Sequence, residues 1–162
     1  MEIVLRQTTE DDLAFVLSVE GDRHNRRFVV VWSEEQHLAA LDNENIAHLV
    51  IETIPDRRTV GYVILSGLQN QNRNIEFQRI VVTDKGKGYG RAAVRAIKRH
   101  AFDTLSAHRL WLEVKDFNMR ARALYGKEAF RYEGTLRECL KGPDGFESLV
   151  LMSILEQEYR AL

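Results

Sequence analysis

The sequence predicts a mixed α/β domain in which antiparallel strands come first, a strand-helix-strand core follows and a hairpin ends the chain. Three features support this: closely spaced strand-like runs over 48–82, a glycine-rich loop followed by an amphipathic pattern, and a strong turn signal at 141–145. The chain has 162 residues, of which 44% are hydrophobic and 29% charged. This is the size and composition of one domain with a buried core, so we expect a single domain over residues 1–162.

The first predicted elements are a strand and two helices. An apolar, extended run at 3–6 predicts the strand. Acidic residues followed by apolar residues at spacings of three and four predict a helix that begins near Thr9. A capping box at 33–36 predicts a second helix, which should end near Leu41 because a polar segment follows it.

Three strands over 48–51, 60–65 and 75–82 are separated by short polar turns, which is typical of an antiparallel meander. In the third strand the apolar alternation changes phase between Phe77 and Ile80. Such a slip indicates a β-bulge, a feature that often lies beside functional sites. The alternative is a strand end that is buried on both faces.

The second half predicts a helix, a strand, another helix and a hairpin. Apolar residues with helical spacing over 94–105 predict the first helix. A strand is expected at 110–114, and a helix at 118–128 whose first residue is a suitable N-cap. Strands at 132–140 and 147–154 flank the glycine- and proline-containing turn and should pair with each other.

Composition argues against several classes of protein. The formal net charge of -1 gives no general attraction to nucleic acid or to an anionic membrane, so neither is an expected partner. The single cysteine, Cys139, excludes an internal disulfide, and we expect it to be half-buried. The five histidines are scattered along the chain, so no metal site is expected. We expect no signal peptide and no membrane segment, and therefore a cytoplasmic location.

The loop at 83–90 is the strongest functional signal. It contains three alternating glycines, follows a predicted strand and precedes a predicted helix. Glycines let the backbone approach a phosphate group, and the amides at a helix N-terminus favour negative charge. Lys85, Lys87 and Arg91 add positive charge. The segment therefore predicts an anion-binding site rather than a simple turn.

Two common phosphate-binding motifs fit this loop poorly. A Walker P-loop needs Lys followed by Ser or Thr after its glycines, and neither pair occurs here. The run Gly88–Ala93 matches a dinucleotide-binding fingerprint, but that motif follows the first parallel strand of a doubly wound sheet. Here a meander precedes it, and Glu113 comes late for the expected ribose-binding acid.

Two motifs together resemble the GNAT superfamily of N-acetyltransferases. The first is the run Lys85–Gly90, which is similar to the family's pyrophosphate motif. The second resembles the family's downstream helix motif and consists of Asn118, Ala121, Leu124 and Tyr125, followed by Ala129 and Phe130. Each motif is weak alone, but their order and separation make the pair specific.

Further segments at 76–78, 107–110 and 132–138 resemble the branch that contains ribosomal-protein N-terminal acetyltransferases and spermidine N-acetyltransferases. The resemblance covers nearly the whole chain. It implies a splayed, mostly antiparallel sheet of about seven strands flanked by about four helices. Two positions depart from the family: Lys85 stands where Arg or Gln is usual, and Ala129 replaces a glycine. If Ala129 is left-handed, it costs about 1 kcal/mol.

The resemblance also implies acetyl-CoA as acetyl donor, no metal and a set of site residues. Tyr125 is the expected proton or hydrogen-bond donor to the departing thiolate, and Glu76 the expected base, with His108 or water as alternatives. The residues expected to bind the cofactor are Ile80, Val81, Val82, Lys85, Gly86, Lys87, Gly88, Tyr89, Gly90, Arg91 and Asn118.

The function that this resemblance implies is direct transfer of an acetyl group to a primary amine, and the acceptor we expect is the N-terminus of a protein or peptide. A polyamine of the spermidine type is the alternative acceptor, for which acids at 10–12 and 34–35 are candidate ligands. An alternative of another class is a non-catalytic acyl-CoA-binding module. A homodimer is a possible assembly.

Overall fold

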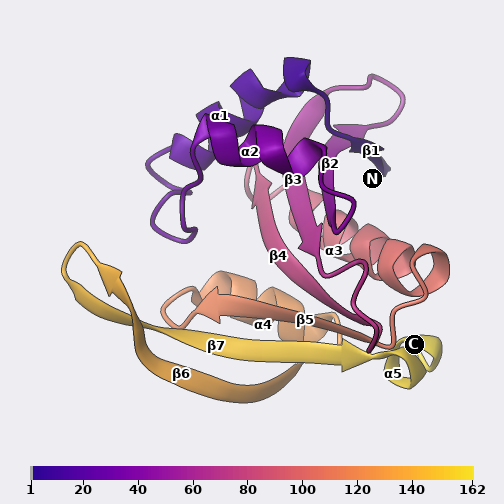
Figure 1. The fold of residues 1–162 in the computed structure, drawn as a ribbon, viewed down its shortest axis with the longest axis vertical. Helices are drawn as coiled ribbons and strands as arrows, with labels where there is room; N and C mark the ends of the chain where they lie inside the picture. Colours follow the sequence, from indigo (N-terminus) through magenta and orange to yellow (C-terminus); the bar gives the residue numbers. More distant parts are fainter. Residues whose placement is uncertain (1) are drawn as a thin grey trace.

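The computed structural model describes residues 2–162 and contains one open, seven-stranded sheet in the order β1-β2-β3-β4-β5-β7-β6 (Figure 1). The strands are β1 (Ile3–Gln7), β2 (Ile46–Thr53), β3 (Thr59–Ser66), β4 (Asn74–Val82), β5 (Arg109–Lys115), β6 (Arg131–Gly142) and β7 (Gly145–Leu155). The helices are α1 (Leu13–Gly21), α2 (Glu34–Leu41), α3 (Tyr89–Arg99), α4 (Met119–Lys127) and α5 (Glu156–Arg160). The predicted mixed, mostly antiparallel sheet is confirmed, and the short helix α5 is an addition.

The two halves of the sheet separate between β4 and β5. These strands are the only parallel neighbours among residues 2–162, and they pair only from Asn74 to Glu76 and from Arg109 to Trp111. Beyond Glu76 and Trp111 the two strands diverge (Figure 1). The resulting opening passes through the middle of the sheet and is therefore accessible to groups from both faces.

A β-bulge in β4 confirms the phase change seen in the sequence. Ile64 pairs with Arg79, whereas the next residue of β3 pairs with Phe77, so Gln78 is the extra residue. The bulge shifts the alternation of side chains by one position, so Phe77 and Arg79 lie on opposite faces of the sheet although they are two residues apart. Phe77 packs with the core under α3 and α4, while Arg79 and Val81 face the side covered by α1.

Two separate cores hold the helices on the sheet. The larger core lies between the sheet and α3 and α4, and the smaller lies between the sheet and α1 and α2. Ile97 and Leu110 are fully buried in the larger core. Val16 and Ile64 are fully buried in the smaller core. The larger core includes Val63 and Phe77 from one half of the sheet and Leu112 and Val150 from the other, so it joins the two halves on the face covered by α3 and α4.

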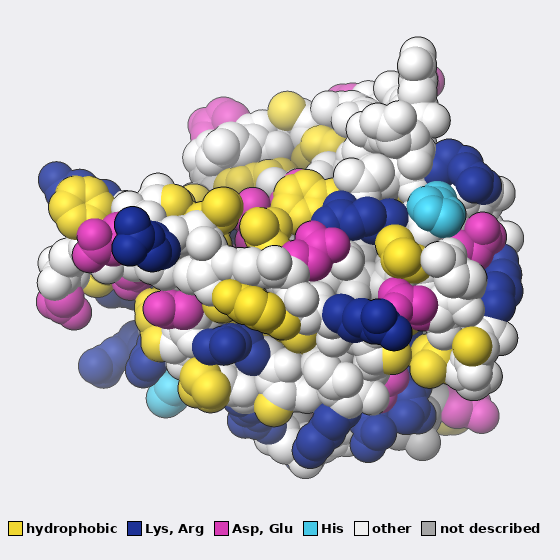
Figure 2. All heavy atoms as spheres, turned by 90° about the horizontal axis from the view of Figure 1, so that it is seen from below, with side chains coloured by type: hydrophobic (Ala, Val, Ile, Leu, Met, Phe, Trp, Pro, Cys, Tyr) yellow, Lys and Arg dark blue, Asp and Glu magenta, His cyan; other side chains and the backbone are white. Residues whose placement is uncertain are grey.

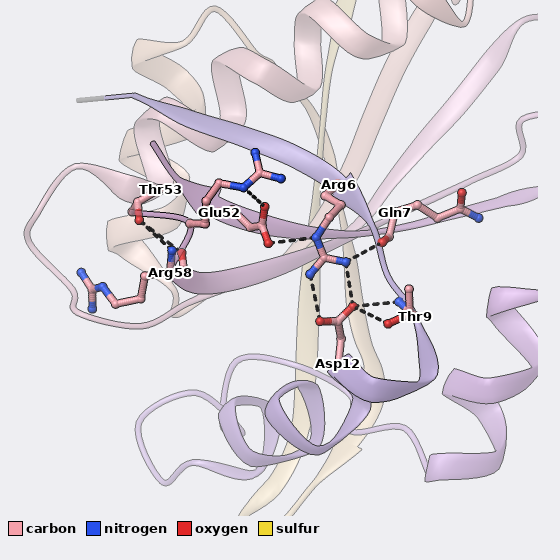
Figure 3. A network of polar contacts seen from close by, with 8 residues as sticks. Arg6, Gln7, Thr9, Asp12, Glu52, Thr53 and Arg58 are labelled. Carbon is pink, nitrogen blue, oxygen red and sulfur yellow. Dashed lines mark hydrogen bonds and ion pairs between the residues drawn. The ribbon is translucent and has the colours of Figure 1, made fainter. Parts of the chain in front are cut away.

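An ion-pair network ties the N-terminal strand to the first helical turn (Figure 3). Arg6 on β1 donates to Glu52 on β2 at 2.9 Å and forms two hydrogen bonds with Asp12 at 2.9 and 3.0 Å. The hydrogen bond from Arg6 lowers the pKa of Asp12. Asp12 also accepts from the amide of Thr9, so its carboxylate caps the turn at Glu10–Asp12.

A second polar network is buried under α1 and α2 and surrounds the carboxylate of Glu20. This side chain is fully buried and accepts hydrogen bonds from Arg79 at 2.6 Å, from the Tyr62 hydroxyl, and from the backbone amide of Trp32 at 2.8 Å. Burial raises the pKa of Glu20, but these donors and His37 outweigh it and set the value at about 2. Glu20 is therefore an anion paired with Arg79.

Two histidines extend this network, although they were expected to be scattered. His37 Nε2 lies 3.2 Å from Glu20, His37 Nδ1 lies 3.1 Å from His48 Nε2, and His48 Nδ1 lies 2.8 Å from the Thr8 hydroxyl. Glu20 can only accept, so when both rings are neutral each ring donates toward Glu20 and accepts from the side of Thr8. In that arrangement Thr8 donates to His48, His48 donates to His37, and His37 donates to Glu20.

This arrangement predicts a loss of stability on acidification. Burial and the neighbouring His37 lower the pKa of His48 from 6.5 to about 4, so the unfolded chain binds more protons between those pH values. The free energy of unfolding should fall by about 1.4 kcal/mol per pH unit below 6.5, or about 2 kcal/mol between pH 7 and pH 5. Urea unfolding at both pH values measures this.

The variant His48→Gln is the control for that measurement. It removes the titrating ring, so its stability should depend less on pH between 7 and 5. His100, whose pKa burial also lowers, contributes equally to both proteins. Glu20 contributes a loss only as the pH falls below 4.5. The same pH dependence in both proteins would show that His48 does not cause it.

Helix α4 ends in a conformation that favours glycine. Ala129 has a φ of 73°, so the suspected left-handed position is confirmed. Ala129→Gly should raise the free energy of unfolding by about 0.5–1 kcal/mol, because glycine removes the strain at its Cβ. The matched control is Ala123→Gly, an exposed position inside the same helix, which should destabilise by about 1 kcal/mol. Chemical unfolding compares both, and a loss of stability in Ala129→Gly would refute the prediction.

Cys139 departs from the prediction. It is exposed rather than half-buried, because β6 lies at the edge of the sheet and most of its side chains face solvent. Among residues 2–162, no helix is long and apolar enough to span a bilayer. In the same residues, no group of three or more His, Cys, Asp or Glu side chains is arranged to hold a metal ion.

Candidate active site

A cleft with a volume of about 1390 Å³ lies where β4 and β5 diverge. It is bordered by the segment after α1, by β4 and the glycine loop, by β5 and by α4. Of the predicted site residues, those that line it are Glu76, Ile80, Val81, Val82, Lys85, Gly86, Gly88, Tyr89, Gly90, Arg91, Asn118 and Tyr125. Lys87 and His108 are not among its lining residues.

The glycine loop presents backbone amides to this cleft. Gly86 and Gly88 both have a φ of 86°, a conformation that side chains rarely tolerate. Gly88 is the N-cap of α3, and the helix begins at Tyr89. The first amides of α3 therefore point into the cleft from a turn that has no Cβ in the way, which is the arrangement that holds phosphate groups.

Three cationic side chains surround the loop. Lys85 and Arg91 were predicted, and Arg120 on α4 is an addition. The Arg120 guanidinium lies close to the loop, because a Cβ built on Gly86 would be 3.9 Å from its Nη2. Burial lowers the pKa of Lys85, and the positive charge of Arg120 lowers it further. A polyanion at this point would relieve that repulsion.

Three cationic side chains of α3 converge on one carboxylate. Glu128, which is buried after α4, accepts from Arg91 Nε at 2.8 Å, from Arg95 Nε at 3.1 Å and from Lys98 Nζ at 3.2 Å. Burial raises the pKa of Glu128, but the three hydrogen bonds outweigh it and the pKa is lowered. Arg91 bonds Glu128 through its Nε, so its two terminal nitrogens can donate hydrogen bonds to a ligand in the cleft.

Helix α4 turns one face toward the cleft. Asn118 caps the helix by accepting from the amide of Ala121 at 3.3 Å, and both residues line the cleft. Tyr125 lies two turns further on the same face. Its ring packs against Phe77 and Phe130, with ring centroids 5.8 and 5.7 Å away. Burial raises the pKa of Tyr125, so its hydroxyl stays protonated at neutral pH.

Two carboxylates face the cleft from the opposite side of the sheet. Their strand neighbours Phe77 and Leu112 belong to the core under α3 and α4, so Glu76 and Glu113 point the other way. Glu76 accepts from the Ser66 hydroxyl at 3.2 Å. Burial raises the pKa of Glu76, and the negative charge of Glu113 raises it further. Sequence reasoning considered Glu113 only as a nucleotide-binding acid.

Other predicted candidates lie elsewhere. His108 is exposed just before β5, at the end where β4 and β5 are still paired. The acids at 10–12 and 34–35 do not line the cleft, and Asp12 is bound to Arg6. They serve helix and turn N-termini, which was the alternative explanation for their positions. The glycine loop follows a strand of a mixed sheet, whereas the doubly wound dinucleotide-binding fold has a mostly parallel sheet. That fold is therefore excluded.

The cleft fits the phosphate groups of a CoA molecule. Left-handed glycines, free amides and three cations gather at one end of it, and Tyr125 lies deeper in the same cleft. The backbone of Ile80–Val82 borders the path between them. These residues would hold the cofactor, which supplies an acetyl group activated as a thioester.

Comparison with known proteins agrees with this geometry. The family model described as acetyltransferase (GNAT) domain matches residues 2–131. The chain therefore belongs to the GNAT acetyltransferases, as the two sequence motifs predicted.

Solved structures of spermidine N-acetyltransferase from Vibrio cholerae are similar over their whole length. A point mutant shares 25% identity, with 99% of this chain and 98% of that chain covered and a TM-score of 0.86. A complex with CoA and spermine shares 23% identity, with 98% of each chain covered and a TM-score of 0.88. A dodecameric form in an intermediate state shares 25% identity, with 97% and 95% covered and a TM-score of 0.82.

These findings establish the class of reaction. The protein is an acyltransferase of the N-acetyltransferase type, and its acetyl donor is acetyl-CoA, as for its family.

Proposed function

We propose that the enzyme acetylates a primary amine of a polyamine. The observation that carries this proposal is the pair of carboxylates, Glu76 and Glu113, that faces the cleft on the side away from α3 and α4. Their mutual repulsion would be relieved by a polycation, which carries several ammonium groups. The full-length similarity to spermidine N-acetyltransferases at 25% identity supports the same acceptor. It favours a polyamine over the peptide N-terminus that the sequence had suggested.

The residue roles in this proposal follow from the two sides of the cleft. Glu76 acts as the base that removes a proton from the amine, directly or through water, and its raised pKa suits that task. Tyr125 donates a hydrogen bond to the thiolate that leaves in a direct transfer. Asn118, Ile80–Val82 and the loop at 85–91 hold the cofactor. Lys87 does not line the cleft, so it is given no direct contact with the cofactor.

An acceptor screen tests the proposal. Acetyl-CoA is mixed with spermidine, spermine or a peptide with a free N-terminus, and thiol release is followed. We expect turnover with both polyamines and little with the peptide. Turnover of the peptide alone would indicate N-terminal acetylation instead. If neither the polyamines nor the peptide is acetylated, both classes of acceptor are rejected.

Glu113→Gln provides a sharper test of the acceptor site. Removal of one negative charge should raise the KM for spermidine about three- to tenfold, because an ion pair with the substrate is lost. The KM for acetyl-CoA should remain unchanged, since the cations that face the cofactor are untouched. An unchanged KM for spermidine would show that Glu113 does not contact the acceptor.

Self-association is a second part of the proposal. Tyr132, Leu136 and Phe146 on the β6–β7 hairpin are 59, 41 and 65% exposed, and Figure 2 shows hydrophobic side chains among charged ones on the face seen from below. The edge strand β6 also leaves one row of backbone groups unpaired. Together with the dodecameric relative, these features support an assembly of two or more copies. Sedimentation velocity reports its size.

A further inference from the structure

The connection between α1 and α2 crosses the opening between β4 and β5. We name residues 22–33 the strap. Asp22–Asn25 and Arg27–Val30 of the strap line the cleft together with the two diverging strands. The strap lies on the sheet face that carries α1, which is also the face of Glu76 and Glu113. It therefore forms the wall of the cleft on the side proposed for the acceptor. The glycine loop leads into α3, which packs against the opposite face of the sheet.

One end of the crossing is attached to β5. Lys115 donates to the backbone carbonyl of Arg27 at 3.0 Å. The rings of Phe28 and Phe117 pack with centroids 5.9 Å apart, and the Arg27 guanidinium lies 4.7 Å from the Phe28 ring. Because Phe117 is 38% exposed, this attachment is open to solvent.

The other end is held by the buried network of Glu20. Arg79 donates to the backbone carbonyl of Val30, and its guanidinium lies 5.1 Å from the Trp32 ring. The amide of Trp32 donates to Glu20 at 2.8 Å, and Arg79 pairs with the same carboxylate. The side chains of Arg79 and Glu20 are 5 and 0% exposed. The bulge at Gln78 is what turns Arg79 to this face.

We propose that Arg79 is a positioning residue for the amine acceptor. It joins the bulged strand β4, which carries Glu76, to the strap, and so fixes the distance between the proposed base and the opposite wall. Because its guanidinium bonds Glu20 and Val30 at the same time, it holds the C-terminal end of α1 and the second half of the strap together. This inference rests on acetyl transfer to an amine, whichever amine is used.

The test is Arg79→Lys. Lysine keeps the charge pair with Glu20 but has no planar fork to bond the Val30 carbonyl as well. The KM for the acceptor should rise about tenfold, because a displaced wall misplaces the bound amine. The KM for acetyl-CoA should stay within about twofold. Without any ligand, trypsin should cut the strap faster, since it carries Arg23, Arg26 and Arg27.

A matched control is Thr8→Val. This change removes the donor to His48 at the far end of the same network, so it lowers the melting temperature but leaves Val30 attached. Its two KM values and its trypsin cleavage should equal those of the wild type. If Arg79→Lys does not fold, Trp32→Leu tests the same attachment, because it removes the stacked ring and leaves the buried ion pair.

The outcomes are distinct. An acceptor KM that does not change in Arg79→Lys, or that rises equally in Thr8→Val, would overturn the positioning role. Faster cleavage of the strap without a change in acceptor KM would also overturn it. The acceptor used is the best one in the wild-type screen, so failure of the polyamine proposal leaves this test intact. Cleavage by trypsin needs no substrate at all.

Discussion

Replacing Tyr125 with phenylalanine should lower kcat about ten- to a thousandfold, the usual range for loss of one acid-base group. The ring of Tyr125 packs between Phe77 and Phe130, and phenylalanine preserves that packing. Only the hydroxyl is lost, and burial keeps that hydroxyl protonated in the native enzyme by raising its pKa. Steady-state thiol release measures kcat, and calorimetry should find acetyl-CoA affinity within a few-fold of the wild type.

Tyr132→Phe serves as the control for this experiment. Tyr132 is 59% exposed on β6, and its hydroxyl bonds only to Thr135 in the same strand. Its removal should leave kcat unchanged. If folded Tyr125→Phe binds acetyl-CoA and turns over at the wild-type rate, Tyr125 is a packing residue. The thiolate would then leave unassisted or take its proton from water.

The substitution Gly88→Asp should weaken acetyl-CoA binding at least tenfold. Gly88 has a φ of 86° at the N-cap of α3, where the helix dipole and free amides favour a phosphate group. An aspartate there places both a side chain and a negative charge in the proposed phosphate site. Aspartate tolerates the left-handed conformation better than most residues, so the fold should survive. Calorimetry with acetyl-CoA measures the affinity.

Gly88→Asn separates the two causes of that loss. Asparagine has nearly the same size and tolerates the same conformation, but it carries no charge. We expect an affinity between those of the wild type and Gly88→Asp. Unchanged affinity in folded Gly88→Asp would remove the loop from the cofactor site. A parallel titration of the wild type with NAD should show no binding, and binding of NAD in place of CoA would contradict the assignment.

Elements with a local signal were predicted well. The capping box before α2 is present, with Ser33 accepting from the amide of Gln36 at 3.2 Å. Asn118 caps α4 as expected, and the phase change in β4 is a bulge at Gln78. Each of these features depends on residues a few positions apart, whose preferences are visible in the sequence. The short helix α5 was missed, since five residues carry little periodicity.

The sequence by itself determined the family, the position of the glycine loop and the face of α4 that carries Asn118 and Tyr125. Each motif lies within a short stretch of chain, and a strand, loop and helix in that order need no further contacts to form an anion site. Their spacing along the chain also sets the order of the elements that bring them to one cleft.

Only the tertiary structure decided which charged residues that are far apart in the sequence pair with each other. Glu20 and Arg79 lie 59 positions apart, and Arg91 and Glu128 lie 37 apart, yet each pair is in direct contact. Nothing local predicts such pairs, so Arg91 was expected at the cofactor site without its partner Glu128, and the histidines were expected to be scattered. Glu113 joined the site only because β4 and β5 diverge beyond three paired residues. Burial makes these partners necessary, because a charge removed from water must find another group to bind it.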